Sequence, residues 1–251
     1  MRNEFVIPDG NEALRGDIPV VVELIERTAL WVNPETFRRL PVWAPYMARG
    51  RSLYNAEWNR RYTNTRKATG VTAEKVEGNV AALKALQAAL GVTNPRPKNW
   101  TVCHIWGYDD SSYAQRSEVV QDPRYYSCLA NMIWLPTPLK GFTDALPEVK
   151  DMLRVCAFQL YGWACDHPAV AEKSARVRSG WVPDGYPRTW PAPERPNVLP
   201  QGTAPLTGCI EEKIAKQKQR IKNLIEDRGL KHFPRDEVLE VLKFWGVQLD
   251  H

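Results

Sequence analysis

Apolar positions along the chain recur mainly with the 3.6-residue period of amphipathic helices. This pattern predicts helices over 20–30, before an Asn-Pro turn, and over 72–90, where a glycine is placed to end the helix. A longer helix is predicted from Pro147 to about 165, with one apolar face directed at a core. Two more helices are predicted near the end of the chain, over 210–225 and from about 236.

Two short apolar stretches interrupt this helical pattern. Residues 99–106 and 131–135 predict strands, and a loop rich in Asp and Ser separates them. We therefore expect an α+β protein that is mostly helical and has a small two-stranded core. Seven prolines within 182–206 predict an extended connector that lies over the surface or swings freely.

These signals divide the chain into four parts. They are an N-terminal helical region (1–98), a strand-containing core with its following helix (99–181), a Pro-rich linker (182–206) and a C-terminal helical pair (207–251). The C-terminal pair has three open arrangements: docking on the main domain, pairing with a second copy of the chain, or lying along a phosphate backbone.

The composition is that of a folded protein, with 43% hydrophobic residues, ten tryptophans and 251 residues in all. No apolar run approaches the ~18 residues of a membrane span, so we expect a cytoplasmic protein. The five cysteines form no CxxC pair, which predicts reduced thiols. A net charge of +5 favours polyanions if the positive charge is clustered.

The densest basic segment lies between residues 49 and 67 and alternates with aromatic residues. Its candidate phosphate contacts are Arg60, Arg61, Arg66 and Lys67. Neighbouring Tyr and Trp side chains are suited to base stacking. The segment therefore predicts contact with nucleic acid, with a solvated amphipathic helix as the alternative.

One constellation combines a histidine, an asparagine and the strand-turn-strand-helix order. His104 ends the first predicted strand, Asn131 begins the second with the pattern Asn-x-apolar-x-Leu, and Lys140 follows nine positions later. Phe142 and Asp144 come next, in the spacing of a Phe-x-Asp sequence. The arrangement resembles the HNH, or ββα-metal, nuclease family. It differs from that family in having Lys140 at the third position and Cys103 where an acidic ligand often precedes the histidine.

The resemblance implies a role for each of these residues. His104 would be the general base that deprotonates water, and Asn131 would hold a divalent metal, expected to be Mg²⁺, through its side-chain oxygen. Lys140 would bind phosphate as a fixed positive charge. Asp109 and Asp110 in the loop, or Asp122 beyond them, would supply the carboxylate that Cys103 lacks.

We therefore expect a metal-dependent endonuclease that hydrolyses double-stranded DNA, of the restriction or phage-defence type, for which a palindromic target would require a homodimer. The alternative is a non-catalytic nucleic-acid-binding protein on a ββα scaffold that has lost its metal. A third interpretation is a helical protein-interaction module. A zinc site is also open, although its ligands match no known spacing: Cys103, His104, Cys128 and His167.

Overall fold

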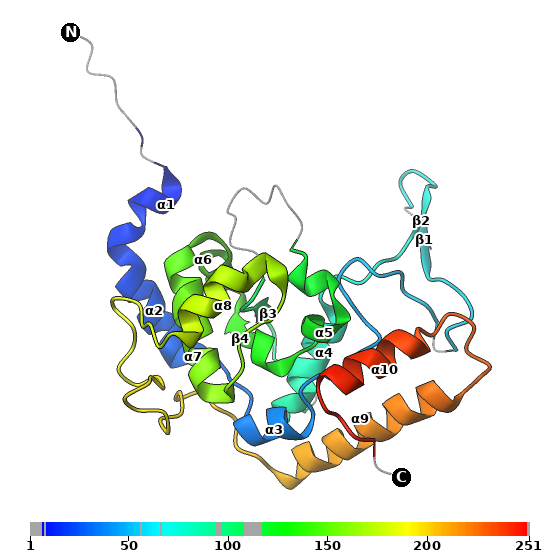
Figure 1. The fold of residues 1–251 in the computed structure, drawn as a ribbon. Helices are drawn as coiled ribbons and strands as arrows, with labels where there is room; N and C mark the ends of the chain where they lie inside the picture. Colours follow the sequence, from blue (N-terminus) through cyan, green and yellow to red (C-terminus); the bar gives the residue numbers. More distant parts are fainter. Residues whose placement is uncertain are drawn as a thin grey trace.

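The computed structural model describes residues 7, 9–55, 57–65, 67–93, 97–107 and 117–249. The predicted α+β class is confirmed, because these residues form mostly helices around two small antiparallel sheets (Figure 1). The helices are α1 Gly10–Ala13, α2 Ile18–Thr28, α3 Pro34–Arg39, α4 Val80–Ala89, α5 Pro123–Tyr126, α6 Lys140–Ala145, α7 Pro147–Tyr161, α8 Ala171–Arg178, α9 Gly208–Glu226 and α10 Arg235–Phe244. The strands are β1 Thr63–Thr65, β2 Thr72–Glu74, β3 Trp100–His104 and β4 Met132–Pro136.

The β3–β4 pair lies at the centre of the molecule and is surrounded by helices (Figure 1). The strands are antiparallel, with Trp100 opposite Pro136 and His104 opposite Met132. Helices α2, α4 and α6 contact these strands, and α7 contacts α2 and α6. Because the strands are covered, β4 is an almost uninterrupted buried apolar run, in which Trp134 is 1% exposed.

Helix α4 begins later than the pattern predicts. A helix from residue 72 is wrong, because Thr72–Glu74 pairs with Thr63–Thr65 as strand β2. The helix starts at Val80, where one carboxylate oxygen of Glu77 accepts hydrogen bonds from the amides of Val80 at 2.6 Å and Ala81 at 3.1 Å. A carboxylate that satisfies free amides of a first turn defines the start of the helix.

Helix α7 ends earlier than predicted, at Tyr161 instead of about residue 165. Gly162 has a φ of 68°, a left-handed conformation that only glycine adopts without strain, and its amide bonds to the carbonyl of Phe158 at 2.8 Å. The predicted apolar face of α7 is buried, as Val149, Leu153 and Cys156 each have 0% exposure.

The Pro-rich segment 182–206 packs along the surface of the main core. Trp190 is 1% exposed and contacts Trp31 edge to face, with 5.8 Å between ring centroids. The amide of Trp31 donates to the carbonyl of Gly202 at 3.0 Å. Of the two arrangements left open for this segment, it therefore adopts the one that lies over the surface.

The C-terminal pair α9 and α10 docks on the main body. Ile210 and Ile214 of α9 belong to the main core, and the Nε1 of Trp245 after α10 donates to the carbonyl of Arg124 at 2.8 Å. A second core lies beneath the pair and includes Trp58 and Ile221. Docking is thus the arrangement that the described contacts show.

Across the described ranges, no helix has both the length and the apolar character that a membrane crossing requires.

Candidate functional site

The strand-strand-helix order places the three HNH-like residues around one end of the central sheet. His104 is the last residue of β3, Asn131 directly precedes β4, and Lys140 is the first residue of α6, which contacts β3. The pattern therefore identified the local order correctly. The chemical role of each side chain depends on its own contacts.

His104 is a packed side chain with a structural hydrogen bond. It is 5% exposed, its Nε2 donates to the carbonyl of Tyr126 at 2.8 Å, and the two rings stack with 5.6 Å between centroids. Burial, together with the positive charge of Arg49, lowers the pKa of His104 to about 3. The imidazole is therefore neutral at pH 7, but a general base must also reach the water that it activates. Its near-complete burial leaves it poorly placed for that role.

Asn131 is fully buried and both polar atoms of its side chain are engaged by the main chain. Its Oδ1 accepts from the amide of Trp106 at 2.7 Å, and its Nδ2 donates to the carbonyl of Tyr125 at 3.0 Å. The backbone carbonyl of Asn131 also accepts from the amide of Ile105 at 2.8 Å. Asn131 therefore ties the segment after β3 to the segment before β4, which is the work of a structural amide.

The carboxylate at the end of the motif is neutralised by lysines. Asp144 is ion-paired with Lys140 one turn earlier on α6, and its second oxygen lies 3.7 Å from the Nζ of Lys150 on α7. Lys150 is 1% exposed, and its ammonium also donates to the carbonyl of His104 at 3.0 Å and lies 3.9 Å from the Sγ of Cys103. An ammonium thus stands among a thiol, a carboxylate and a carbonyl, the ligand types that would otherwise surround a metal cation.

The residues described do not fit the divalent metal that the resemblance implies. The side-chain oxygen of Asn131 is used by a backbone amide, and both oxygens of Asp144 face ammonium groups. Asp122 caps α5 and holds Arg124 with contacts of 2.6 to 3.1 Å. No cluster of three or more His, Cys, Asp or Glu residues suited to a metal occurs in the described ranges, and the proposed zinc set is not brought together there. Asp109 and Asp110 lie outside the described residues.

Sequence reasoning missed Lys150, the cation at the centre of this cluster. A signal was present, because Lys150 follows Val149 and precedes Leu153 by three residues, which places a charge within the apolar face of a predicted helix. Arg154 on the same helix is also fully buried, and its guanidinium bonds to Asp151 at 2.8 Å and lies over the ring of Trp106. A cation on an apolar helix face therefore marks a buried ion pair in this protein.

The basic segment predicted to touch phosphate lies on an exposed arm of the molecule. Arg60 is exposed, and Arg61 pairs with Glu74 at 2.6 Å, with its guanidinium 5.9 Å from the ring centroid of Tyr54. Lys67 is exposed in the turn between β1 and β2, and Arg66 lies outside the described residues. The segment forms a hairpin with its connections, so the amphipathic-helix alternative is wrong.

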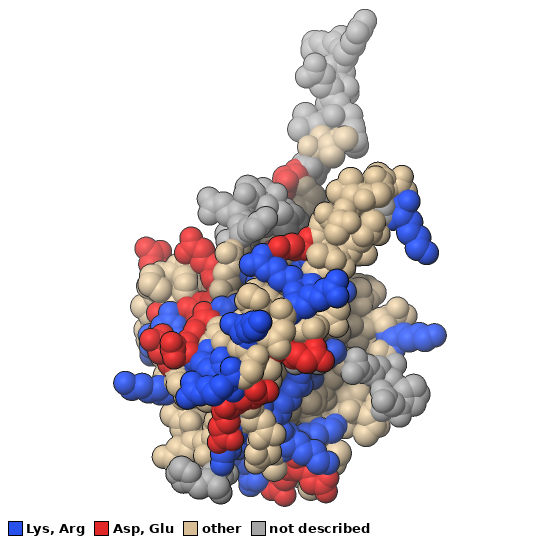
Figure 2. Space-filling model, turned by 90° about the vertical axis from the view of Figure 1, so that its right-hand side faces the viewer, with Lys and Arg blue, Asp and Glu red and all other residues tan. Residues whose placement is uncertain are grey.

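Many Lys and Arg side chains, interspersed with Asp and Glu, lie on the face that carries this arm and the α9–α10 connection (Figure 2). Two hydrogen bonds join these segments, from the amide of Lys231 to the Oδ1 of Asn59 at 3.0 Å and from the amide of His232 to the carbonyl of Trp58 at 3.1 Å. The imidazole of His232 stacks on Tyr54, with 4.9 Å between ring centroids. The arm is thus anchored to the C-terminal pair by hydrogen bonds and aromatic stacking.

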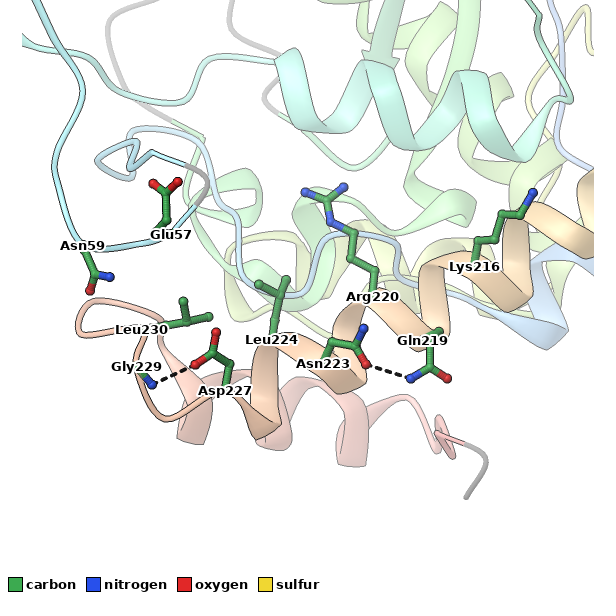
Figure 3. A pocket seen from close by; sticks show the side chains of 10 residues that line it. All are labelled: Glu57, Asn59, Lys216, Gln219, Arg220, Asn223, Leu224, Asp227, Gly229 and Leu230. Atoms are coloured by element: carbon green, nitrogen blue, oxygen red, sulfur yellow. Dashed lines mark hydrogen bonds between the residues drawn. The ribbon is translucent and has the colours of Figure 1, made fainter.

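A groove of about 830 Å³ opens between α4 and α9 on the same side of the molecule. Its walls include four basic side chains and one carboxylate, that of Glu77, which is engaged by the first amides of α4. The ammonium of Lys213 donates to the carbonyl of Val92 at 3.1 Å. We call the other three cations and two tyrosines at the base of the arm the basic groove: Tyr54, Tyr62, Lys84, Lys216 and Arg220. A neighbouring hollow of about 630 Å³ shares Lys216 and Arg220 and extends along α9 to its end (Figure 3). Figure 3 shows both cations reaching from α9 toward α4.

The cations of the basic groove are available to a ligand. Within the described part of the chain, neither Lys84 nor Arg220 makes an ion pair, and Lys216 meets only Glu212, at 3.6 Å, with both side chains more than 70% exposed. Exposed pairs of that kind contribute little and are easily exchanged. The groove therefore presents positive charge that no internal ion pair requires, and beside it the half-exposed ring of Tyr62, whereas the ring of Tyr54 is stacked between Trp58 and His232.

The order β3, β4 and α6 is present, but the polar side chains described there form hydrogen bonds and ion pairs within the protein. In the basic groove, by contrast, Lys84 and Arg220 have no acidic partner in the described chain. These two regions are the candidate sites of the molecule. No protein-family model, no curated protein and no solved structure matches the chain.

Proposed function

We propose that this protein binds nucleic acid through the basic groove. The observation that carries the proposal is the groove itself, in which Lys84 and Arg220 stand without acidic partners in the described chain, beside Tyr54 and Tyr62. Nucleic-acid affinity comes largely from cations that neutralise phosphates and release counterions. The half-exposed ring of Tyr62 next to such cations adds a surface for stacking on exposed bases.

The surrounding surface supports the same ligand. The exposed side chains of Arg60 and Lys67 on the arm add positive charge near the groove, whose wall includes Tyr54 and Tyr62 of the same arm. A positive face draws a polyanion toward it and raises its local concentration.

We further propose that this binding does not lead to metal-dependent cleavage. Binding without cleavage was the alternative to the endonuclease expected from the sequence. Cleavage stays a prediction with one observation in its favour, the order of β3, β4 and α6. Against it stand the buried ring of His104, the engaged amide of Asn131 and the ammonium of Lys150 beside Asp144. We therefore place the function in the groove.

A salt titration tests the binding proposal. Fluorescence anisotropy of a labelled DNA would be measured over a series of salt concentrations for the natural protein and for Lys84→Gln/Lys216→Gln/Arg220→Gln. Each lost phosphate contact lowers the slope of log K against log salt by about 0.9 for duplex DNA, so we expect a decrease of roughly 2 to 3. A control with the same charge change is Arg15→Gln/Arg27→Gln/Arg188→Gln, at exposed positions outside the groove.

The control variant should keep a slope within about 1 of the natural protein, because its residues lie outside the groove. Equal slopes for both triple variants would contradict the assignment of the groove. Binding that ignores salt in all three proteins would instead favour a protein-interaction module.

A plasmid digest separates binding from cleavage. Supercoiled plasmid would be incubated with the protein in Mg²⁺, in Mn²⁺ and in EDTA, and we expect no nicking in any of them. Metal-dependent nicking that is lost in both His104→Ala and Lys140→Ala would restore the nuclease prediction. Lys140 is useful here because it is partly exposed, so its substitution perturbs the core less than that of His104.

A further inference from the structure

The β1–β2 hairpin is a two-stranded ribbon that projects from the body (Figure 1). All six residues of its paired strands are exposed, in the register Thr63 with Glu74, Asn64 with Ala73 and Thr65 with Thr72. A two-stranded hairpin has marginal stability in water, and this ribbon buries neither of its faces. Its projecting form therefore requires a reason outside the packing of the core.

The two faces of the ribbon differ in how their polar groups are satisfied. Because side chains alternate along a strand, Thr63, Thr65, Thr72 and Glu74 share one face. On that face Glu74 pairs with Arg61 at 2.6 Å, and the hydroxyls of Thr65 and Thr72 lie 2.8 Å apart. This first face is largely occupied by its own contacts.

The opposite face, which we call the open face, consists of Tyr62, Asn64, Ala73 and Lys75. The amide of Asn64 and the ammonium of Lys75 have no side-chain partner among the described residues, and Tyr62 is 50% exposed. Ala73 lies directly opposite Asn64 and, being small, leaves space beside the amide. The open face thus offers an amide, a methyl group and a cation to a partner.

The open face is continuous with the basic groove. Tyr62 belongs to both, since it lines the groove together with Tyr54, Lys84 and Arg220. A strand of phosphates held in the groove would therefore pass beside the base of the ribbon. Positive charge at the groove, at Lys75 and at Lys67 of the turn is complementary to a polyanion.

We propose that the ribbon enters the major groove of duplex DNA and that Asn64 contacts a base edge there, an inference that rests on the proposed nucleic-acid binding. The major groove of B-form DNA admits a two-stranded ribbon, whereas the deep and narrow major groove of A-form RNA does not. An asparagine amide matches the N6 and N7 groups of adenine, and an alanine methyl group packs against the methyl group of thymine. Asn64 and Ala73, opposite each other, suit an A·T base pair.

Selection from a pool of DNA duplexes with a randomised centre tests this proposal. The natural protein should enrich a sequence motif that contains an A·T position. Asn64→Ala should lose the preference at that position by roughly 5- to 150-fold, the discrimination of one bidentate base contact. The matched control is Thr63→Ala, one residue away on the other face, which should enrich the same motif as the natural protein.

Both substitutions are at exposed positions whose side chains make no hydrogen bond or ion pair within the described chain, so neither threatens folding. A competition with duplex RNA of the same sequence provides a second measurement, and the RNA should compete at least ~10-fold less well than the DNA motif. Enrichment of no motif, or an unchanged motif in Asn64→Ala, would overturn the assignment of the ribbon while leaving binding in the groove intact. Failure of the natural protein to retain any duplex at low salt would instead overturn the proposed function.

Discussion

Replacing Asn131 with alanine tests whether the central asparagine is a structural residue or a metal ligand. The substitution removes the acceptor of the Trp106 amide at 2.7 Å and the donor to the Tyr125 carbonyl at 3.0 Å. Both partner residues are buried, with exposures of 0% and 1%. Neither backbone group can turn to water without opening the segments around the central strands.

The magnitude follows from these two orphaned groups. A buried donor or acceptor left without a partner costs about 1–3 kcal/mol, so two of them should lower the free energy of unfolding by roughly 2–6 kcal/mol. Against a total stability of about 5–15 kcal/mol for a folded domain, this is a large fraction. Urea denaturation followed by tryptophan fluorescence measures it directly, since ten tryptophans report on the fold.

The control is Asn223→Ala on α9, where an exposed amide accepts one hydrogen bond from Gln219 at 2.7 Å. This change should alter the free energy of unfolding by no more than about 0.5 kcal/mol. A metal ligand predicts a different result, in which Mg²⁺ raises the unfolding temperature of the natural protein by binding the folded state. A loss below about 1 kcal/mol in Asn131→Ala, together with such a rise, would refute the structural role of this asparagine.

Three further predictions concern the same core and its surroundings. Because the pKa of His104 is about 3 in the folded protein and about 6.5 in the unfolded chain, the stability that its neutral ring contributes is present above pH 6.5 and is lost as the pH falls toward 3. Between pH 7 and pH 5, the free energy of unfolding measured with urea should therefore fall by about 2 kcal/mol less in His104→Gln than in the natural protein, and equal decreases would contradict this. Gly202→Ala should destabilise the protein by about 2 kcal/mol or more, because the added Cβ would overlap the carbonyl oxygen of Ala29, whereas the Cβ added by the control Gly208→Ala would meet nothing within 4 Å. Similar unfolding temperatures for the two variants would show that the Pro-rich segment is not docked. Exchange of EDTA for Mg²⁺ should leave the unfolding temperature unchanged, since ammonium groups already neutralise Asp144. A rise in the unfolding temperature with Mg²⁺ would reveal a metal site.

The amino-acid sequence was informative wherever a local periodic signal determines the structure. The strands around Val102 and Ile133, the apolar face of α7 and the helices of the C-terminal pair were all predicted, because their burial pattern follows from residues close together in the chain. The order of His104, Asn131 and Lys140 was likewise visible from spacing alone.

Only the tertiary structure decided what these elements do. Thr72–Glu74 became a strand because a partner strand pairs with it, and the start of α4 depends on the side chain of Glu77. The side chain of Asn131 is engaged by amide and carbonyl groups of residues 25 and 6 positions away, and Lys150 reaches Asp144 and His104 from another helix. Hydrogen bonds and burial between distant segments set these roles, and a linear pattern of residue types does not record them.

The basic groove shows the same division. The sequence by itself marked the arginines of the arm as a basic, aromatic segment, and it marked residues 210–225 as an amphipathic helix. It did not show that Lys84 of α4 and Arg220 of α9 line one groove with Tyr54 and Tyr62. The apolar face of α9 is buried against the main body, next to α4, and this packing leaves the charged side chains of α9 at the surface. Packing of the core therefore brings together cations that lie more than a hundred residues apart in the chain.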